Sequence, residues 1–167
     1  MDYTIFSAIN GLAGQNSFLD QFGIFFAKYF LYIFLGIALL LLYRKDLRNN
    51  VYAGIVSLLI SRGIIVEIIK RVIARPRPFE TLDVHLLLVD EGTRRSFPSG
   101  HTVMLFSLAF AFWGTRWFWP FFALAMIGSL SRVFVGVHYP TDILASIVIA
   151  AAVVWAIRRL FKKAEIS

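Results

Sequence analysis

The sequence predicts an all-α integral membrane protein: a bundle of five transmembrane helices plus a short N-terminal helix that lies at the membrane interface or forms a sixth span. Hydrophobic residues make up 59% of the 167 positions, and the mean hydropathy is +0.73. A soluble domain of this length needs far more polar surface. Apolar runs near the ~20 residues that cross a hydrocarbon core use nearly all of the length. We therefore expect one membrane-embedded domain, residues 1–167.

The transmembrane helices are expected at five apolar runs separated by polar loops. Before them, Tyr3, Phe6, Ile9 and Leu12 recur at helical spacing, which indicates a short amphipathic helix. The fifth run begins at Pro140, because proline is favoured at the first position of a helix. The runs are residues 22–43, 51–73, 101–113, 118–137 and 140–161.

Charged residues inside the second run are costly in a membrane and usually have partners there. Arg62 is the deepest of them, and we expect an internal pairing or hydrogen-bonding role for it. Glu67 and Arg71 are four residues apart on one helix face, where they can pair.

Lys and Arg outnumber Asp and Glu by 17 to 10, and the positive-inside rule accounts for most of this excess without a nucleic-acid partner. Basic residues of the short loops gather on one side of the predicted topology: Arg44, Lys45, Arg48, Arg116 and the cluster from Arg158 to Lys163. We place that side and the C-terminus in the cytoplasm of a cell (inner or plasma) membrane. The long loop before Ser99 and the turn around His138 then face outward. Cysteine is absent, which excludes disulfides and thiol chemistry.

The first of three charged motifs on the outward side is Lys70-x6-Arg77-Pro78, at the end of the second run. Pro76 and Pro78 stop the helix, so Arg77 is expected on a loop. Cations here either snorkel to the interface or clamp a phosphate, Arg as a planar fork and Lys as a point charge.

The second motif is Pro98-Ser99-Gly100-His101, directly before the third run. Ser99 suits a helix N-cap, and Gly100 lets a ligand approach the backbone closely. The free amides of a helix N-terminus also bind anions. Ordinary capping explains the serine, but it does not explain a histidine at the mouth of a membrane span.

The third motif is Ser131-Arg132-x5-His138-x3-Asp142. His138 is expected just outside the fifth helix and Asp142 in its first turn. Asp142 either favours the helix dipole or accepts a bond from one imidazole nitrogen and leaves the other free to attack. We interpret His138 as a nucleophile, Asp142 as the group that orients it, and Arg132 as a holder of the phosphate.

Together, in this order and without a departure at any signature position, the three motifs resemble the signature of the type 2 phosphatidic acid phosphatase superfamily. They span about the second half of the chain. The resemblance implies a helical membrane phosphatase that works without metal or cofactor and passes through a phosphohistidine. It implies His138 as nucleophile, Asp142 as its partner and His101 as general acid, with phosphate bound by Lys70, Arg77, Ser99, Gly100 and Arg132. No metal is expected from the residues either, because Glu80, Asp83, Asp90 and Glu91 lack an obvious ligand spacing.

A site at the membrane surface favours a lipid substrate whose head carries the phosphate. The opening segments 1–6 and 16–20 resemble the bacitracin-resistance type of undecaprenyl pyrophosphate phosphatase, which implies removal of the terminal phosphate of that lipid from outside. Alternatives are phosphatidylglycerophosphate, phosphatidate or lipid A phosphatase, and, in another class, a non-catalytic membrane protein that binds anionic lipid. Three loop arginines suit either a pyrophosphate or anionic headgroups: Arg75, Arg94 and Arg95.

Overall fold

The computed structural model describes residues 2–88 and 95–164, and within them every regular element is a helix. This confirms the predicted all-α class. Helices η1 and η2 are short 3₁₀ turns, and η3 is a π-helical turn. In chain order the elements are α1 (Asp2–Asn10), α2 (Ser17–Lys28), α3 (Phe30–Leu40), η1 (Leu41–Tyr43), η2 (Lys45–Leu47), α4 (Arg48–Ile60), η3 (Ser61–Ile65), α5 (Val66–Val72), α6 (Pro78–Thr81), α7 (Gly100–Ala111), α8 (Phe118–Phe134) and α9 (Pro140–Ala164).

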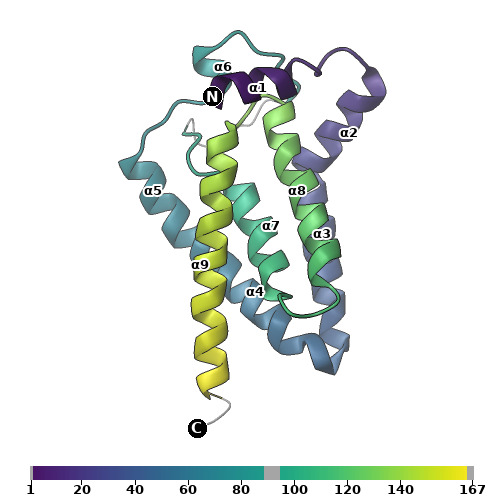
Figure 1. Ribbon diagram of the computed structural model, residues 1–167, viewed down its shortest axis with the longest axis vertical. Coiled ribbons are helices and arrows are strands. Elements are labelled where there is room, and N and C mark those ends of the chain that lie inside the picture. Colours follow the sequence, from purple (N-terminus) through teal and green to yellow (C-terminus); the bar gives the residue numbers. More distant parts are fainter. Residues whose placement is uncertain (1, 89–94, 165–167) are drawn as a thin grey trace.

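Helix α7 is the centre of the bundle. It packs against α4, α8 and α9, and more lightly against α3 (Figure 1). Most of its residues are buried on every face, which is typical of a helix that is apolar all round. The short helices α1 and α6 lie across one end of the bundle, and α9 runs from that end to the C-terminus at the other (Figure 1).

Two helical segments of the described chain are long and apolar enough to cross a membrane, Lys45–Val72 and Pro140–Lys162. Helix α2 and the segment Phe30–Tyr43 meet the same criteria only when they are taken together as one span. Helices α7 and α8 are apolar but have only 12 and 17 residues. By length and composition, the structure therefore gives two or three spans where the sequence predicts five.

A bend of 53° at Tyr29 divides the predicted span over residues 22–43 into two helices, α2 and α3. Arg132 of α8 donates from Nη1 to the carbonyl oxygen of Ala27, in the last turn of α2, over 2.9 Å. A side chain that enters the hydrogen-bond ladder of a helix is an established cause of sharp kinks. The bend therefore coincides with the hydrogen bond from Arg132 to α2.

Aromatic side chains fill the middle of the bundle. The ring of Phe121 lies 4.8 Å from that of Phe34 and 4.6 Å from that of Phe112, between ring centroids. All three residues are buried. Inside a membrane such contacts stabilise through close packing, because lipid tails are as apolar as the side chains. They hold α3, the end of α7 and the start of α8 together.

The five-residue turn between α8 and α9 is fixed by a glycine and an asparagine. Gly136 adopts a φ of +85°, a left-handed conformation that glycine reaches without strain. A Cβ on Gly136 would stand 3.2 Å from the carbonyl oxygen of His85. The buried amide of Asn10 donates both to that carbonyl and to the carbonyl of Phe134, over 2.9 and 2.8 Å. The turn that carries His138 is thus held under α1.

Candidate active site

His138 and Asp142 form a buried pair at the start of α9. The Nδ1 atom of His138 lies 3.3 Å from Oδ2 of Asp142, and 2% and 0% of the two side chains are exposed. The same oxygen accepts the backbone N–H of Tyr139 over 2.9 Å. Helix α9 begins at Pro140, as predicted. The bond from Tyr139 is therefore a capping bond at the start of α9, and it holds the carboxylate in place.

Arg75 binds the other oxygen of the same carboxylate. Its Nη1 donates to Oδ1 of Asp142 over 2.9 Å and to the hydroxyl of Thr141 over 2.7 Å. Its Nη2 donates to Asp2 over 2.7 Å, and its guanidinium carbon lies 3.8 Å from the centre of the Tyr139 ring. The sequence suggested Arg75 for a pyrophosphate or a headgroup, whereas in the structure two carboxylates hold it.

The contact through Arg75 fastens α1 to the site. Asp2 also accepts the backbone N–H and the hydroxyl of Thr141, over 3.1 and 2.6 Å. Burial alone would raise the pKa of Asp2, but the bonds from Arg75 and Thr141 outweigh it and lower the pKa below its usual value. Helix α1 is therefore tied to α9 by an ionised carboxylate as well as by packing.

The imidazole of His138 is neutral at neutral pH. Burial lowers its pKa from 6.5 to about 4; the bond to Asp142 opposes this, and the charges of Arg132 and Arg77 add to it. A neutral ring has one nitrogen with a lone pair, which a histidine nucleophile requires. The effect of Arg132 and Arg77 on this pKa also shows that both arginines lie close to the ring.

The three predicted cations are nearly buried, with 6%, 3% and 2% of the surface exposed for Lys70, Arg77 and Arg132. Lys70 donates from Nζ to the carbonyl of Arg95 over 3.1 Å, and Arg95 donates back to the carbonyl of Lys70 over 2.7 Å. This exchange joins the end of α5 to the segment that leads into α7. Positive charge beside a helix N-terminus favours a bound anion.

Ser99 begins α7, as the sequence predicts for an N-cap, and it is linked to α9. Its Oγ accepts the backbone N–H of Thr102 over 3.4 Å. The hydroxyl of Ser146 lies 3.0 Å from the carbonyl oxygen of Ser99 and 2.6 Å from that of Asp142. The helix ends that carry His101 and Asp142 are therefore joined by a buried hydroxyl, and His101 itself is half-buried.

Arg62 lies on the π-helical turn η3 and reaches the same motif. It donates to Glu67, which confirms an internal partner for Arg62 and shows that Glu67 pairs with it rather than with Arg71. A Cβ on Gly100 would stand 2.8 Å from Nε of Arg62. π-helical turns occur frequently at functional sites. This one places Arg62 against Gly100 of the second motif.

A carboxylate of the long loop has a structural role next to the site. Glu80 accepts the backbone N–H of Arg77 over 3.1 Å and so begins α6. His85 is exposed. Among the residues that the structure describes, no three histidine or carboxylate side chains are grouped to hold a metal ion. Two of the loop carboxylates and one of the loop arginines lie outside the described part of the chain: Asp90, Glu91 and Arg94.

Local sequence patterns did not predict the roles of Arg75, Asp2 and Asn10. Arg75 stands two positions before Arg77, so the Arg-Pro-Arg-Pro stretch was the available signal. Asp2 and Asn10 bond to residues more than 70 positions away, and no local pattern predicts such contacts.

Comparison with known proteins agrees with this site. Residues 51–166 match the PAP2 superfamily. The chain is 36% identical over 156 residues to undecaprenyl-diphosphatase BcrC of Bacillus subtilis, across 90% of this chain and 79% of that protein. It is 32% identical over 145 residues to an undecaprenyl-diphosphatase of Sulfolobus acidocaldarius, across 84% and 69%.

Similarity extends to a relative with another named substrate and to a solved structure. A lipid A 1-phosphatase of Rhizobium johnstonii is 36% identical over 95 residues, across 53% of this chain and 39% of that protein. The crystal structure of Aquifex aeolicus LpxE superposes with a TM-score of 0.81 at 26% identity, across 95% and 94% of the two chains. The family match over more than half of its length shows that the chain belongs to the PAP2 superfamily, as its three motifs predict.

Proposed function

We propose that the protein removes the terminal phosphate of undecaprenyl pyrophosphate without a metal ion, through a phosphohistidine on His138. The chain is a phosphatase by its family, and two relatives that it matches over most of their length are named undecaprenyl-diphosphatases. The observation that carries the mechanism is the buried contact of His138 with Asp142, within reach of the charges of Arg77 and Arg132.

In the proposed reaction, Nε2 of His138 attacks the terminal phosphorus while Nδ1–H keeps its hydrogen bond to the Asp142 carboxylate, which stabilises the positive charge that forms on the imidazole. The bond between Nε2 and phosphorus forms as the bond from phosphorus to the bridging oxygen breaks. His101 protonates that oxygen, and undecaprenyl phosphate departs. Water then attacks the phosphohistidine, His101 takes a proton from the water, and inorganic phosphate leaves with Nε2 restored.

The remaining predicted residues are proposed to bind the phosphoryl oxygens. Phosphoryl transfer requires positioning and neutralisation of the charge on these oxygens. Lys70, Arg77 and Arg132 supply three positive charges, and Ser99 and Gly100 bring the N-terminus of α7 alongside. The buried state of all three cations supports this role, because a water-poor site strengthens their interaction with an anion.

A lipid A-type phosphate is the second candidate substrate. The relatives named lipid A 1-phosphatase favour it over phosphatidylglycerophosphate or phosphatidate. A non-catalytic protein that binds anionic lipid is the remaining alternative, and it predicts that His138→Ala leaves the function intact.

Phosphate release from a panel of lipids in detergent tests the proposal. The panel contains undecaprenyl pyrophosphate, phosphatidate, phosphatidylglycerophosphate and lipid A, each with the native protein and with His138→Ala. We expect fastest release from undecaprenyl pyrophosphate and none with the variant, which must still be folded in detergent. Faster release from lipid A would assign the second candidate, and equal rates on all four would contradict a specific substrate.

We also propose that the chain is one domain of five spans (α2 with α3, α4 with α5, α7, α8 and α9), with the His138 end outward and the C-terminus in the cytoplasm. Basic residues at the other end of the bundle support this orientation. Because the chain has no cysteine, single cysteines at Gln15 and Lys45 can be labelled separately. A membrane-impermeant thiol reagent added to intact cells is expected to label Gln15→Cys only. Labelling of Lys45→Cys only would reverse the topology.

A further inference from the structure

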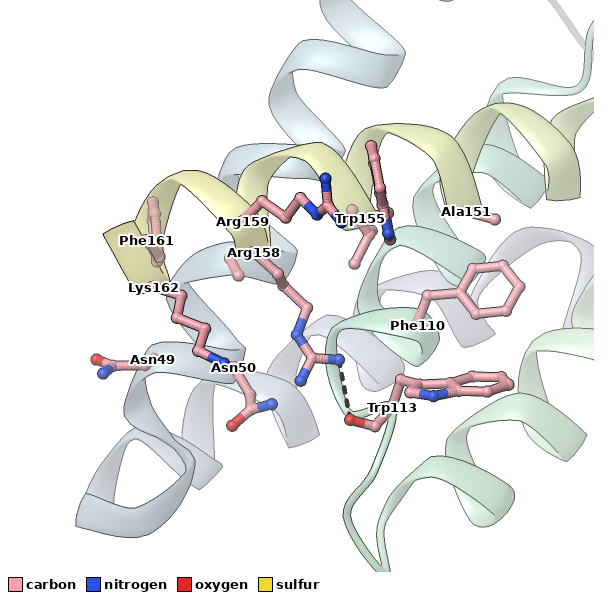
Figure 2. A pocket seen from close by; sticks show the side chains of 12 residues that line it. Asn49, Asn50, Phe110, Trp113, Ala151, Trp155, Arg158, Arg159, Phe161 and Lys162 are labelled. Carbon is pink, nitrogen blue, oxygen red and sulfur yellow. Dashed lines mark hydrogen bonds between the residues drawn. The ribbon is translucent and has the colours of Figure 1, made fainter. Parts of the chain in front are cut away.

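A second cavity lies at the end of the bundle opposite His138. It has a volume of about 720 Å³ and is enclosed by the C-terminal part of α9, the start of α4 and the end of α7 (Figure 2). This volume is in the range of pockets that bind small molecules. From Pro140 to Arg158, α9 rises about 27 Å at roughly 1.5 Å per residue, close to the ~30 Å of a hydrocarbon core. The cavity and the active site therefore belong to opposite surfaces of the membrane.

Three cations from α9 line this cavity: Arg158, Arg159 and Lys162. None of the described residues that line it is acidic. Figure 2 shows the side chain of Arg158 extending from α9 toward the end of α7, where Nη1 donates to the carbonyl oxygen of Trp113 over 2.9 Å. On the neighbouring turn, the guanidinium carbon of Arg159 lies 4.2 Å from the centre of the Trp155 ring. Both guanidinium groups are therefore oriented before any ligand arrives.

Aromatic side chains form the apolar wall of the cavity. Phe110 of α7 and Trp113 of the turn after α7 line one side, and Trp155 and Phe161 of α9 line the other. The two tryptophans are 59% and 60% exposed, as is usual where a protein meets the boundary between lipid and water. A ligand of this cavity therefore meets positive charge and apolar surface together.

An exposed apolar stripe continues from the cavity along α9. Leu144, Val148 and Trp155 fall on one face at helical spacing, with 62%, 68% and 60% of each exposed. From Trp155 to Leu144 the stripe is about 17 Å long. It ends at the cavity, next to Arg159.

We propose that this cavity binds the headgroup of an anionic phospholipid, with an acyl chain along the stripe on α9. Guanidinium groups bind phosphate through paired hydrogen bonds, and basic pockets between helices at a membrane surface suit anionic headgroups. A free phosphate ion uses the cations but leaves the aromatic wall and the stripe uncovered, so we commit to the lipid. The lipid belongs to the leaflet opposite the active site and ties α9 to α4 and α7.

Native mass spectrometry of the purified protein with phosphatidylglycerol or phosphatidylcholine tests the proposal. The native protein is expected to retain phosphatidylglycerol in preference to phosphatidylcholine. Arg158→Gln with Lys162→Gln is expected to lower the affinity for phosphatidylglycerol about ten-fold or more. The matched control, Arg44→Gln with Lys45→Gln, removes two charges from the same end of the bundle outside the cavity and is expected to retain the lipid. Equal losses in the two double variants would overturn the proposal.

A second variant separates the cavity from general attraction to charge. Ala151 lines the cavity, so Ala151→Phe fills space without changing charge and is expected to release phosphatidylglycerol. All variants are expected to keep phosphatase activity, which reports their folding because their sites lie far from His138. If the double variant at Arg158 and Lys162 does not fold, Ala151→Phe carries the test. Retention of lipid by Ala151→Phe, or displacement of lipid by inorganic phosphate at equal concentration, would contradict the proposal.

Discussion

Arg75 and His138 bind opposite oxygens of one carboxylate. The guanidinium of Arg75 donates to Oδ1 of Asp142 over 2.9 Å, and Nδ1 of His138 lies 3.3 Å from Oδ2. Arg75 holds the carboxylate in place, and the carboxylate orients the imidazole. Arg75 is therefore a positioning residue that acts on the nucleophile through Asp142.

Replacement of Arg75 is expected to reduce turnover rather than binding. We expect Arg75→Ala to lower kcat about ten- to a hundred-fold with little change in KM, because Asp142 loses the group that holds it. Arg75→Lys keeps the charge without the planar fork and should restore part of kcat. Arg71→Ala, at an exposed position nearby, is the control. Values of kcat and KM for Arg75→Ala that match those of the control would contradict the positioning role of Arg75.

The pH dependence of kcat/KM reports the protonation of His138 in the free enzyme. Burial lowers the pKa of His138 to about 4 from 6.5, so the nucleophile stays neutral as the pH falls from 7 to 5. We therefore expect kcat/KM on the preferred lipid of the panel to have no acidic limb near pH 6.5. A half-maximal value of kcat/KM near pH 6.5 in the native protein would contradict this prediction.

The same pKa predicts how stability depends on pH. Between pH 6.5 and about 4 the unfolded chain binds a proton at His138 that the native protein does not bind. The free energy of unfolding therefore decreases as the pH falls through this range, with a full effect on the order of 3 kcal/mol. Denaturation in detergent should show a weaker pH dependence for His138→Gln than for the native protein. Equal dependence in both would assign the effect to other groups.

The close approach of Arg62 to Gly100 predicts a coupled pair of substitutions. Gly100→Ala places a methyl group 2.8 Å from Nε of Arg62, so it is expected to displace the guanidinium and lower kcat/KM about ten-fold or more. Arg62→Ala removes the obstacle. In a double-mutant cycle the combined variant should lose less activity than the two single losses predict together. Additive losses would show that the contact does not connect the two residues.

The sequence predicted those features that local chemistry determines. Pro140 marks the start of α9 and Ser99 caps α7, so His138 and His101 could be placed at helix ends without a structure. The bend at Tyr29 could not be predicted, because it coincides with a bond from Arg132 to Ala27, 105 positions away. The prediction that Glu67 pairs with Arg71 was wrong for a related reason. The π-helical turn changes which residues share a helix face, and it brings Arg62 to Glu67 instead.

The same limit applies to the site and to the second cavity. The three motifs named residues that contact one another in the structure, such as Ser99 and Asp142 through Ser146. Arg75 was expected only to bind a pyrophosphate or a headgroup. Its two carboxylate partners come from α1 and α9, far away in the sequence, so no local pattern indicated them. The basic tail was interpreted only as an orientation signal, since a cavity requires the packing of α4, α7 and α9 around it.

The most direct test of the account is the capture of the phosphoenzyme. Native protein is mixed rapidly with undecaprenyl pyrophosphate, quenched in alkali and digested, and the peptides are analysed by mass spectrometry. We expect one phosphoryl group on the peptide that contains His138, absent from His138→Ala and accumulating in His101→Ala during slow hydrolysis of the intermediate. Release of phosphate at the native rate by His138→Ala, or a phosphoryl group on a different residue, would contradict the central claim.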